Sequence, residues 1–457
     1  MLNISVLIDS KNYISGVNKP IIDSMTNKDA KSENSRSPQK GLMDELTSRG
    51  LVHDVSHSII PSILDHNTTT FYCGYDPTAP SLHAGSLVPI LLQKRLQIAG
   101  HRPIVLIGGG TGMIGDPSGK SDERNLLSQQ TLAQNISGLE QQFKTYLDFS
   151  AGPNSALMLN NSDWLEDQNL ISFLRDTGKH FPLGSMLSRE SVKRRLDSAS
   201  GISFTEFAYQ VLQAYDFYHL YKHYDCRLQV GGSDQYGNIL SGIDYIRRVT
   251  TDIDPALGFV FPLLTTTSGE KMGKTAKGAL WLDTNLTSPF EFYQYWLNID
   301  DRDAVRFLKI LTFLELDEIS EIENKFLENK SSRLAQKKLA EEVTLMIHGV
   351  NGLEEAMAGT SALFADDETK TLDGIPSISI TSSVLSEGYD LRTALQAVGL
   401  ADSISAAKRL IRQDAVTVNG DKVTQGRNSI GSSDVDDEGT IFLGVGSRHK
   451  AVIRVID

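Results

Sequence analysis

The first half of the chain alternates short apolar runs with stretches of helical periodicity. The five runs are Thr68–Cys73, Pro103–Ile107, Ala156–Leu159, Arg227–Val230 and Phe259–Leu264. Their β-branched and aromatic residues suit buried strands, and strands that alternate with helices are typical of a mostly parallel sheet. The pattern therefore predicts a doubly wound α/β domain over residues 39–265.

The second half has a different pattern. A Gly- and Lys-rich loop precedes Ser288, which is predicted to cap a helix with Pro289 at its first position, and helical periodicity continues to residue 365. The last segment starts with two short helical patterns and continues with short strands, two of which an Asn-Gly turn joins. We expect a mobile loop at 266–285, an all-helical domain at 286–365, a polar linker at 366–388 and a small α+β domain at 389–457.

Composition narrows the class of protein. With 457 residues the chain is too long for one ordinary core, and its 40% hydrophobic and 22% charged residues are those of a soluble globular protein. A net charge of -13 argues against a generic polyanion binder, so any contact with RNA must be local. Only two cysteines are present, which excludes a disulfide framework and favours a reducing compartment.

No membrane or secretion signal is visible in the sequence. No apolar run approaches the ~20 residues that a membrane-spanning helix needs. Residues 1–38 are polar and irregular, without the apolar segment of a signal peptide or the Arg-rich bias of a transit peptide. We expect a disordered leader there, and an organellar address stays open.

The exit of the first predicted strand carries many polar groups. In FYCGYDPTAPSLHAGSL, residues 71–87, Gly74 and two prolines end the strand and impose a turn. Ligands of open α/β sheets bind beyond the carboxyl ends of the strands, and this edge offers Tyr72, Asp76, Thr78, His83 and Ser86. The segment taken alone is equally a Pro-stabilised loop with a His at a helix start.

Two further strand exits are rich in glycine. The segment GGGTGMIGDPSGK fits neither the Walker spacing nor a dinucleotide fingerprint, but Asp116 could receive an ammonium group, and Lys120 and Arg124 a polyphosphate. In GGSDQ, residues 231–235, the glycines let backbone approach a ligand and the carboxylate could bind ribose hydroxyls. A solvated loop and a simple turn are the alternatives.

A helix and a loop complete the candidate chemistry. In the predicted helix Phe204–Phe217, Tyr209, Gln213 and Asp216 fall at i, i+4 and i+7, so they share one face that points either at a ligand or at water. The loop KMGKT places Lys271 and Lys274 three residues apart beside glycines, which suits a transition state that releases pyrophosphate. An exposed loop is the alternative for KMGKT.

Together these motifs resemble those of one enzyme family. HAGS at the first strand exit and KMGKT after the last strand are similar to the two signatures of class I aminoacyl-tRNA synthetases, in their order and context. The full set, with GGGTGMIGDPSGK, FTEFAYQVLQAYDF and GGSDQYGN, closely resembles bacterial-type tyrosyl-tRNA synthetase from about Gly41 to the C-terminus. The resemblance implies a Rossmann-like catalytic domain, a KMSKS-type loop, a helical anticodon-binding domain and a C-terminal αL-type RNA-binding domain.

The resemblance also implies a reaction and a site. The expected activity is that of a tyrosine–tRNA ligase, which forms tyrosyl-adenylate and pyrophosphate from tyrosine and ATP and then transfers tyrosine to the terminal adenosine of tRNA(Tyr). The implied tyrosine site is Tyr72, Asp116, Tyr209, Gln213, Asp216 and Gln235, with Tyr72 and Asp216 on the phenol hydroxyl. The implied ATP site is Cys73, Gly74, Asp76, Thr78, His83, Gly232, Asp234 and Lys274. The implied catalytic groups are His83, Ser86, Lys120, Arg124, Lys271, Lys274 and Thr275.

The first signature departs from the family pattern. Ser86 stands where the family usually has a second His, so we expect slower activation or altered ATP affinity. In the second signature, Gly273 and Thr275 replace two serines, and we expect these replacements to have little effect on activity.

The expected partners follow from the same resemblance. They are tRNA(Tyr), L-tyrosine, ATP with Mg²⁺ and a second copy of the chain, with no dedicated protein metal site, no membrane and no DNA. Lys408, Arg409 and Arg412 are the expected RNA contacts of the C-terminal domain, and residues 193–195 are candidates for the acceptor arm. The expected location is the cytoplasm, with an organellar matrix as the alternative.

Three other readings stay open on the sequence. A tryptophanyl enzyme shares the fold, but its indole pocket does not need Tyr72 and Asp216 to bind a phenol hydroxyl. A small-molecule adenylyltransferase shares the nucleotide signatures but needs no RNA-binding appendage. A catalytically silent RNA-binding paralogue is consistent with Ser86 but not with the intact lysines of KMGKT.

Overall fold

A six-stranded sheet organises the N-terminal domain. The computed structural model describes residues 41–118, 127–197, 201–252, 254–267, 269, 272–275, 278–364, 377–423, 426–436, 439–446 and 449–456. The strand order is β1 (Asp54–Val55), β6 (Leu257–Phe261), β5 (Cys226–Gly232), β2 (Thr70–Tyr75), β3 (Arg102–Ile107) and β4 (Leu157–Asn160). All pairs are parallel except β1 with β6. The five predicted strands are confirmed, whereas β1 is two residues long and was not predicted.

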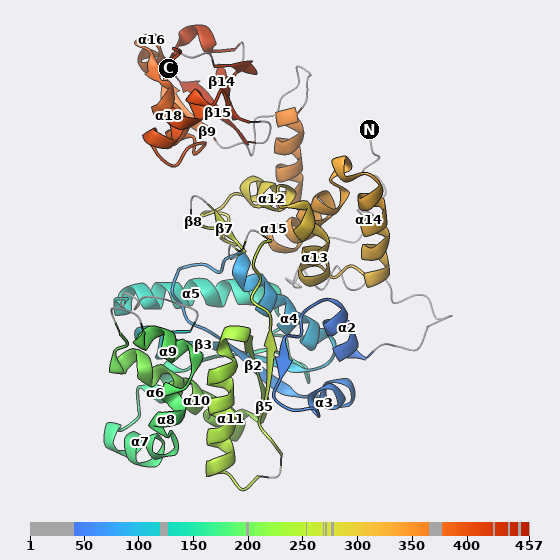
Figure 1. Cartoon of the computed structure of the whole chain (residues 1–457), viewed down its shortest axis with the longest axis vertical. Helices are drawn as coiled ribbons and strands as arrows, with labels where there is room; N and C mark the ends of the chain where they lie inside the picture. The colour runs from blue at the N-terminus through green and yellow to red at the C-terminus, as the bar shows by residue number, and fades with distance from the viewer. Residues whose placement is uncertain are drawn as a thin grey trace.

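Alternate residues of the central strands face two separate hydrophobic clusters. From β3, Val105 and Ile107 join one cluster, while Ile104 and Leu106 join the other. Such alternation is the signature of a strand covered on both faces. The first cluster includes residues of α4 (Leu87–Ile98) and α5 (Gln129–Tyr146), and the second includes residues of α10 (Phe204–Tyr224) and α11 (Tyr236–Val249). The fold is therefore the expected doubly wound α/β arrangement (Figure 1).

Shorter elements surround the sheet. The segment before β2 holds α2 (Leu42–Ser48) and α3 (Ile60–His66). Between β4 and α10 lie α6 (Ser162–Leu165), α7 (Leu170–Asp176), α8 (Leu183–Leu187) and α9 (Glu190–Leu196). After β6, a small hairpin joins β7 (Lys274–Thr275) to β8 (Gly278–Ala279).

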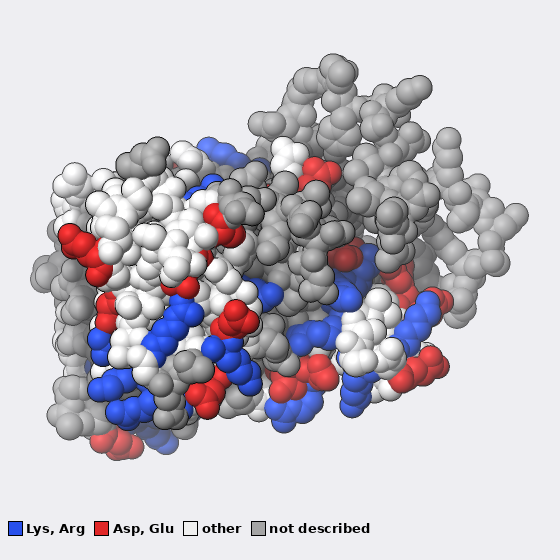
Figure 2. Space-filling view, turned by 90° about the horizontal axis from the view of Figure 1, so that it is seen from above, with Lys and Arg blue, Asp and Glu red and all other residues white. Residues whose placement is uncertain are grey.

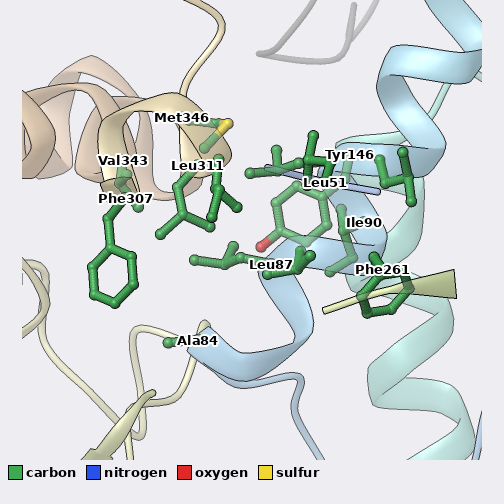
Figure 3. Packing of buried hydrophobic residues seen from close by; sticks show 14 of the residues in the cluster. Leu51, Ala84, Leu87, Ile90, Tyr146, Phe261, Phe307, Leu311, Val343 and Met346 are labelled. Atoms are coloured by element: carbon green, nitrogen blue, oxygen red, sulfur yellow. The ribbon is translucent and has the colours of Figure 1, made fainter. Parts of the chain in front are cut away.

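The helical domain shares its core with the sheet domain. Its helices are α12 (Pro289–Leu297), α13 (Asp301–Leu311), α14 (Leu316–Glu328) and α15 (Leu334–Phe364). Ser288 caps α12 as predicted, since its side chain accepts a hydrogen bond from the backbone N–H of Glu291. Figure 3 shows Phe307, Leu311, Val343 and Met346 of this domain opposite Leu87, Ile90 and Phe261, and all belong to one buried cluster.

Two arginines strengthen this junction. Arg49 and Arg95, both buried, donate to backbone carbonyl oxygens just beyond the end of α13, where Thr312 accepts from both. Carbonyl groups at a helix C-terminus have no intrahelical partner, so the guanidinium groups satisfy them. The two domains are thus held by apolar packing and by buried hydrogen bonds.

The C-terminal module has a hydrophobic core of its own. Its main sheet has the order β12 (Asp421–Lys422), β11 (Val416–Val418), β14 (Thr440–Val445), β15 (His449–Ile456) and β9 (Ser377–Thr381). A second pair joins β10 (Tyr389–Asp390) to β13 (Ser429–Ile430), and the helices are α16 (Ser382–Ser386), α17 (Leu391–Ala397) and α18 (Ile404–Arg412). The Asn-Gly turn is confirmed, with both Asn419 and Gly420 at positive φ.

One predicted boundary is wrong. The polar linker was expected to extend to residue 388, but β9 and α16 lie within it, and β9 pairs in parallel with β15. Its sequence, SISIT, alternates Ser with Ile, and Ile380 is buried in the core of the module. The leader, residues 1–38, lies outside the described residues. Over the part of the chain that is described, no helix is both long and apolar enough to cross a membrane.

Candidate active site

A cavity of about 380 Å³ opens at the carboxyl ends of the central strands. Most of the residues singled out from the sequence line it. They are Tyr72, Cys73, Gly74, Asp76, Thr78, His83, Ser86, Asp116, Tyr209, Gln213, Gly232, Asp234 and Gln235. From β2 the chain runs outward through β3 and β4 and then returns to β5 on the other side of β2. The cavity lies at this reversal of strand order, which is where doubly wound sheets bind ligands.

Asp216 lies behind the cavity wall, buried on α10. Asn161 Nδ2 donates to its Oδ2 at 2.9 Å, and Trp164 Nε1 donates to its Oδ1 at 2.8 Å. Burial raises the pKa of the Asp216 carboxyl to about 8, although these two hydrogen bonds lower it. The carboxyl group is therefore held in a fixed orientation in a dry environment.

Tyr72, the third residue of β2, lies close enough to this carboxyl group to interact with it electrostatically. Its side chain is buried, and its hydroxyl has no hydrogen-bond partner among the described residues. Burial, together with the nearby Asp216, raises the pKa of the Tyr72 phenol. A buried hydroxyl without a partner is costly, so a ligand with a polar group at this point would satisfy it.

The polar face predicted on α10 is turned inward. Tyr209 is buried and donates from its hydroxyl to Asp76 Oδ2 at 3.0 Å, and Asp76 Oδ1 accepts from Thr111 at 2.9 Å. Ser203 caps the helix N-terminus, with its side chain accepting from the N–H of Glu206. The alternative that this face points at water is wrong.

Side-chain amides connect the helix to the glycine-rich segment after β3. Gln235 Nε2 donates to Asp116 Oδ2 at 2.7 Å, while Gln235 Oε1 accepts from Gln213 Nε2 at 3.2 Å. Asn238 adds a bond to Gln213 Oε1 at 2.9 Å. Residues from three distant segments are thereby joined into one hydrogen-bonded chain along the cavity.

Glycines allow the backbone to approach these groups. A Cβ atom on Gly108 would lie 2.2 Å from Asp76 Oδ1 and 2.5 Å from Thr111 Oγ1. Gly74 has the opposite surroundings, because a Cβ atom there would meet nothing within 4 Å. The first glycine permits a close internal contact, and the second leaves open space beside the strand.

The two signature segments lie against each other. The backbone N–H of Ala84 donates to Leu280 O at 2.8 Å, and His83 forms an isolated bridge with Trp281. Gly273 has φ +78°, and a Cβ atom there would lie 2.8 Å from the Cβ of Ala84. The loop that carries the second signature is therefore seated directly on the first.

The residues of the first signature differ in their surroundings. His83 is exposed, and its Nδ1 accepts from the N–H of Gly85 at 3.0 Å. The backbone N–H of Ser86 donates to His83 O at 2.7 Å at the start of α4. Lys120, Arg124 and Lys271 lie outside the described residues, and of Lys274 and Thr275 only the backbone in β7 is described.

Sequence reasoning missed three residues of the site. Asn161 and Trp164 hold Asp216, and Thr111 holds Asp76. Asn161 directly follows β4, so the rule applied to the other strand exits would have found it. The pairing of Trp164 with Asp216 had no signal in the sequence.

The expected RNA contacts are accessible on the C-terminal module. Lys408, Arg409 and Arg412 are exposed on α18. In the view of Figure 2, Lys and Arg side chains lie mixed with Asp and Glu across the lower half of the visible face. In the other candidate segment, Arg195 is buried in an ion pair with Glu206 at 2.8 Å, so it is not available to RNA.

Within the described ranges, no group of three or more His, Cys, Asp or Glu side chains is placed to hold a metal ion.

Comparisons with known proteins agree with this geometry. The family model "tRNA synthetases class I (W and Y)" matches residues 64–365, and the S4 domain model matches residues 391–434. Tyrosine–tRNA ligases from Rhodopirellula baltica and Roseiflexus castenholzii are 43% and 44% identical, each over 91% of this chain and over 97% and 99% of their own length. A C-terminally truncated mitochondrial tyrosyl-tRNA synthetase from Aspergillus nidulans matches at 33% identity and a TM-score of 0.64, covering 71% of this chain and 95% of that one.

Proposed function

Because the chain belongs to the class I tRNA synthetases of the tryptophan and tyrosine group, we propose that the cavity beyond β2 is where it activates an amino acid with ATP. The enzyme is a tyrosine–tRNA ligase, like the curated relatives that it matches over nine-tenths of its length. Different residues of the cavity bind the different parts of tyrosine and ATP.

The phenol hydroxyl of tyrosine binds between Tyr72 and Asp216. The observation that supports this most is the buried Tyr72 hydroxyl without a partner, next to a carboxyl group that Asn161 and Trp164 hold in place. A phenol hydroxyl both donates and accepts, so it would satisfy both groups. Phenylalanine would leave the Tyr72 hydroxyl without a partner in a dry site and would offer no hydrogen bond to Asp216, and this is why the site rejects it.

The ammonium and carboxylate groups of tyrosine lie further along the cavity. Asp116, Tyr209 and Gln213 offer a carboxylate, a hydroxyl and an amide oxygen that can accept from the ammonium group. Gln235, which is bonded to both Asp116 and Gln213, is placed to orient the amino-acid carboxylate. Binding in this pose holds the reacting carboxylate toward the open end of the cavity.

ATP occupies the open end. The backbone at Cys73, Gly74 and Gly232 lines the adenosine site, Asp234 binds the ribose hydroxyls, and Asp76 lies between the two substrates. Thr78 and His83 face the outer phosphates. The lysine and arginine residues 120, 124, 271 and 274 stabilise the charge of the pyrophosphate.

The reaction has two steps. A carboxylate oxygen of tyrosine attacks the α-phosphorus of ATP, the bond to the β-phosphate oxygen breaks, and pyrophosphate leaves from tyrosyl-adenylate. Mg²⁺ arrives with ATP and neutralises part of the phosphate charge. A ribose hydroxyl of the terminal adenosine of tRNA then attacks the tyrosyl carbonyl carbon, and AMP leaves. The enzyme contributes position and charge and forms no covalent bond to either substrate.

The tRNA contacts extend beyond this domain. The helical domain binds the anticodon side, and the exposed basic residues of α18 bind the RNA backbone. The module that contains α18 matches the S4 domain over residues 391–434, which supports a role in RNA binding. Binding through a few local cations is compatible with the net charge of -13.

A second copy of the chain covers an apolar surface on the sheet domain. Leu170, Ile171, Leu183 and Phe204 are 67%, 70%, 64% and 77% exposed, and they lie on α7, α8 and the start of α10. Large apolar side chains with this much exposure are candidates for an interaction surface. Sedimentation of the unmodified chain and of Phe204→Asp tests the homodimer, since a charge in a dimer interface should yield monomers.

The sources of the relatives support a proposal about the location. The curated relatives come from bacteria and the solved one from a mitochondrion, so we place the enzyme in the cytoplasm or in an organellar matrix. Subcellular fractionation would test this.

Tyrosine-dependent exchange of pyrophosphate into ATP tests the proposed function. Tyrosine, phenylalanine and tryptophan should be assayed in parallel, and only tyrosine should support rapid exchange. Exchange that depends on tryptophan would identify the other enzyme of this group. The lack of exchange with all three would indicate a silent RNA-binding paralogue.

A further inference from the structure

His219 lies one turn beyond Asp216 on α10, outside the cavity. Its imidazole stacks on the indole of Trp164, with ring centroids 4.2 Å apart and an interplanar angle of 11°. The same indole donates its Nε1–H to Asp216 Oδ1 at 2.8 Å. Residues at i and i+3 share one helix face, so Trp164 spans the two positions, with its edge on Asp216 and its face on His219.

The stack controls the direction of the hydrogen bond. The indole N–H lies in the plane of the ring, so tilting the ring turns the donor away from the carboxyl oxygen, and hydrogen bonds weaken steeply with angle. Trp164 sits on α6, a helix of four residues, and its backbone oxygen accepts a bond from Gln168. Its ring is buried in the hydrophobic cluster that includes Tyr72 and Phe217, and the parallel contact with His219 adds a constraint on the plane of the ring.

We propose that His219 is a positioning residue for amino-acid selection: by stacking on Trp164 it fixes the indole that orients the Asp216 carboxyl group toward the phenol hydroxyl of tyrosine. This inference rests on the proposed function, because it assigns His219 to the tyrosine end of that site. His219 itself touches neither substrate. Its protonation is not required, since a flat neutral ring makes the same contact; burial lowers the pKa of its imidazole to about 4.

The test compares two substitutions of similar volume. His219→Phe keeps a flat ring over the indole, whereas His219→Leu fills the space without one. In pyrophosphate exchange, the Leu variant should raise the KM for tyrosine by about threefold to tenfold, the range expected for one aromatic pair, and lower the preference for tyrosine over phenylalanine by a similar factor. The Phe variant should stay within about twofold of the unmodified enzyme, and neither should change the KM for ATP.

A double substitution tests whether His219 acts through Trp164. Trp164→Phe removes the donor but keeps an aromatic ring, so it should weaken tyrosine binding on its own. If the path runs through the indole, His219→Leu should then add little further loss in that background. His180→Leu is the matched control, because His180 is also half-buried and contacts Tyr245 instead, so its kinetics should be unchanged.

Several results would overturn the proposal. Equal kinetics of the Phe and Leu variants would exclude a role for the stack. So would a loss in the Leu variant that extends to kcat and to the KM for ATP. Fully additive effects of His219→Leu and Trp164→Phe would show that His219 does not act through the indole. If the Leu variant does not fold, His219→Ala carries the same comparison with Phe. Failure of the proposed function would give a different result, because the unmodified enzyme would then show no tyrosine-dependent pyrophosphate exchange.

Discussion

The two ends of the cavity are built in different ways. At the proposed tyrosine end, Tyr72, Tyr209 and Asp216 are buried, and Asp216 accepts bonds from Asn161 and Trp164. At the proposed nucleotide end, Gly74, Thr78 and His83 are exposed. On the proposed function, selection of the amino acid would depend on a rigid scaffold, whereas the charged part of ATP would meet an open site.

The contrast fits the chemistry of each end. Discrimination between tyrosine and phenylalanine requires groups that cannot relax or take up water when the hydroxyl is missing. ATP must enter and pyrophosphate must leave, which favours cations on a loop, as proposed for Lys271 and Lys274. If the two ends are independent, a substitution at one end should leave the function of the other unchanged.

The largest effect is expected from Asp216→Ala. The change removes the carboxyl group proposed to bind the phenol hydroxyl and takes away the acceptor of Asn161 and Trp164, so kcat/KM for tyrosine should fall by about 100-fold or more. Pyrophosphate exchange measures it, and the KM for ATP should not change. An unchanged preference for tyrosine over phenylalanine would contradict the role of Asp216.

At the other end, Lys274→Ala should damage the chemical step alone. Loss of one cation that stabilises the departing pyrophosphate should lower kcat by about 10- to 100-fold. Equilibrium dialysis with labelled tyrosine should show unchanged affinity, because the tyrosine end is separate. Loss of tyrosine binding in this variant would mean that the two ends are coupled.

The contact between the two signatures can be broken with one methyl group. Gly273→Ala places a Cβ atom 2.8 Å from the Cβ of Ala84 at a residue with φ +78°, so the loop must move off the first signature. We expect kcat to fall by about tenfold with little change in tyrosine affinity. Gly269→Ala is the matched control, because Gly269 also has positive φ, +86°, but a Cβ atom there meets nothing within 4 Å. Equal losses in both variants would mean that backbone strain, not the contact, is responsible.

The positions of several site residues could be predicted from the sequence. The i, i+4, i+7 spacing placed Tyr209, Gln213 and Asp216 on one face, and the strand-exit rule brought in Tyr72 and Asp76, because both depend on local geometry. The hydrogen-bond partners could not be predicted, since they depend on how separate elements pack. Asp76, for example, bonds to Tyr209 and Thr111, which lie far from it in the chain.

The fold likewise has features that depend on local sequence, which were predicted, and features that depend on tertiary packing, which were not. Five strands of the sheet and the cap of α12 come from periodicity and from local residue preferences, and they were predicted. β9 falls inside the predicted linker because the polar residues around SISIT obscure its alternation and because its partner, β15, lies at the other end of the module. The shared core of the sheet and helical domains is likewise a tertiary feature that no local pattern indicates.

The dryness of the tyrosine end predicts a dependence of stability on pH. Burial raises the pKa of Asp216 from its ordinary value near 4 to about 8, so the folded protein holds a proton there that the unfolded chain releases. This group therefore favours folding at low pH, and its contribution is lost as pH rises from about 4 through about 8. Asp216→Asn removes the dependence, so the melting temperature of the variant minus that of the unmodified protein should increase between pH 5 and pH 9. A difference that stays constant would show that the carboxyl is ionised throughout and that the pocket is wet.

The smallest effect is expected at the first signature. Ser86 lines the open end at the start of α4, where the family usually has a second His, and Ser86→His restores a longer group that can reach the nucleotide. One added hydrogen bond to a charged ligand should raise kcat/KM for ATP by about twofold to tenfold without affecting the KM for tyrosine.

Ser86→Ala is the control, and it should change activity by less than about twofold if the short hydroxyl makes no contact with ATP. A large loss in the Ala variant would mean that Ser86 already serves the nucleotide, so that its departure from the family pattern is compensated within this chain. A change in tyrosine affinity in either variant would contradict the independence of the two ends.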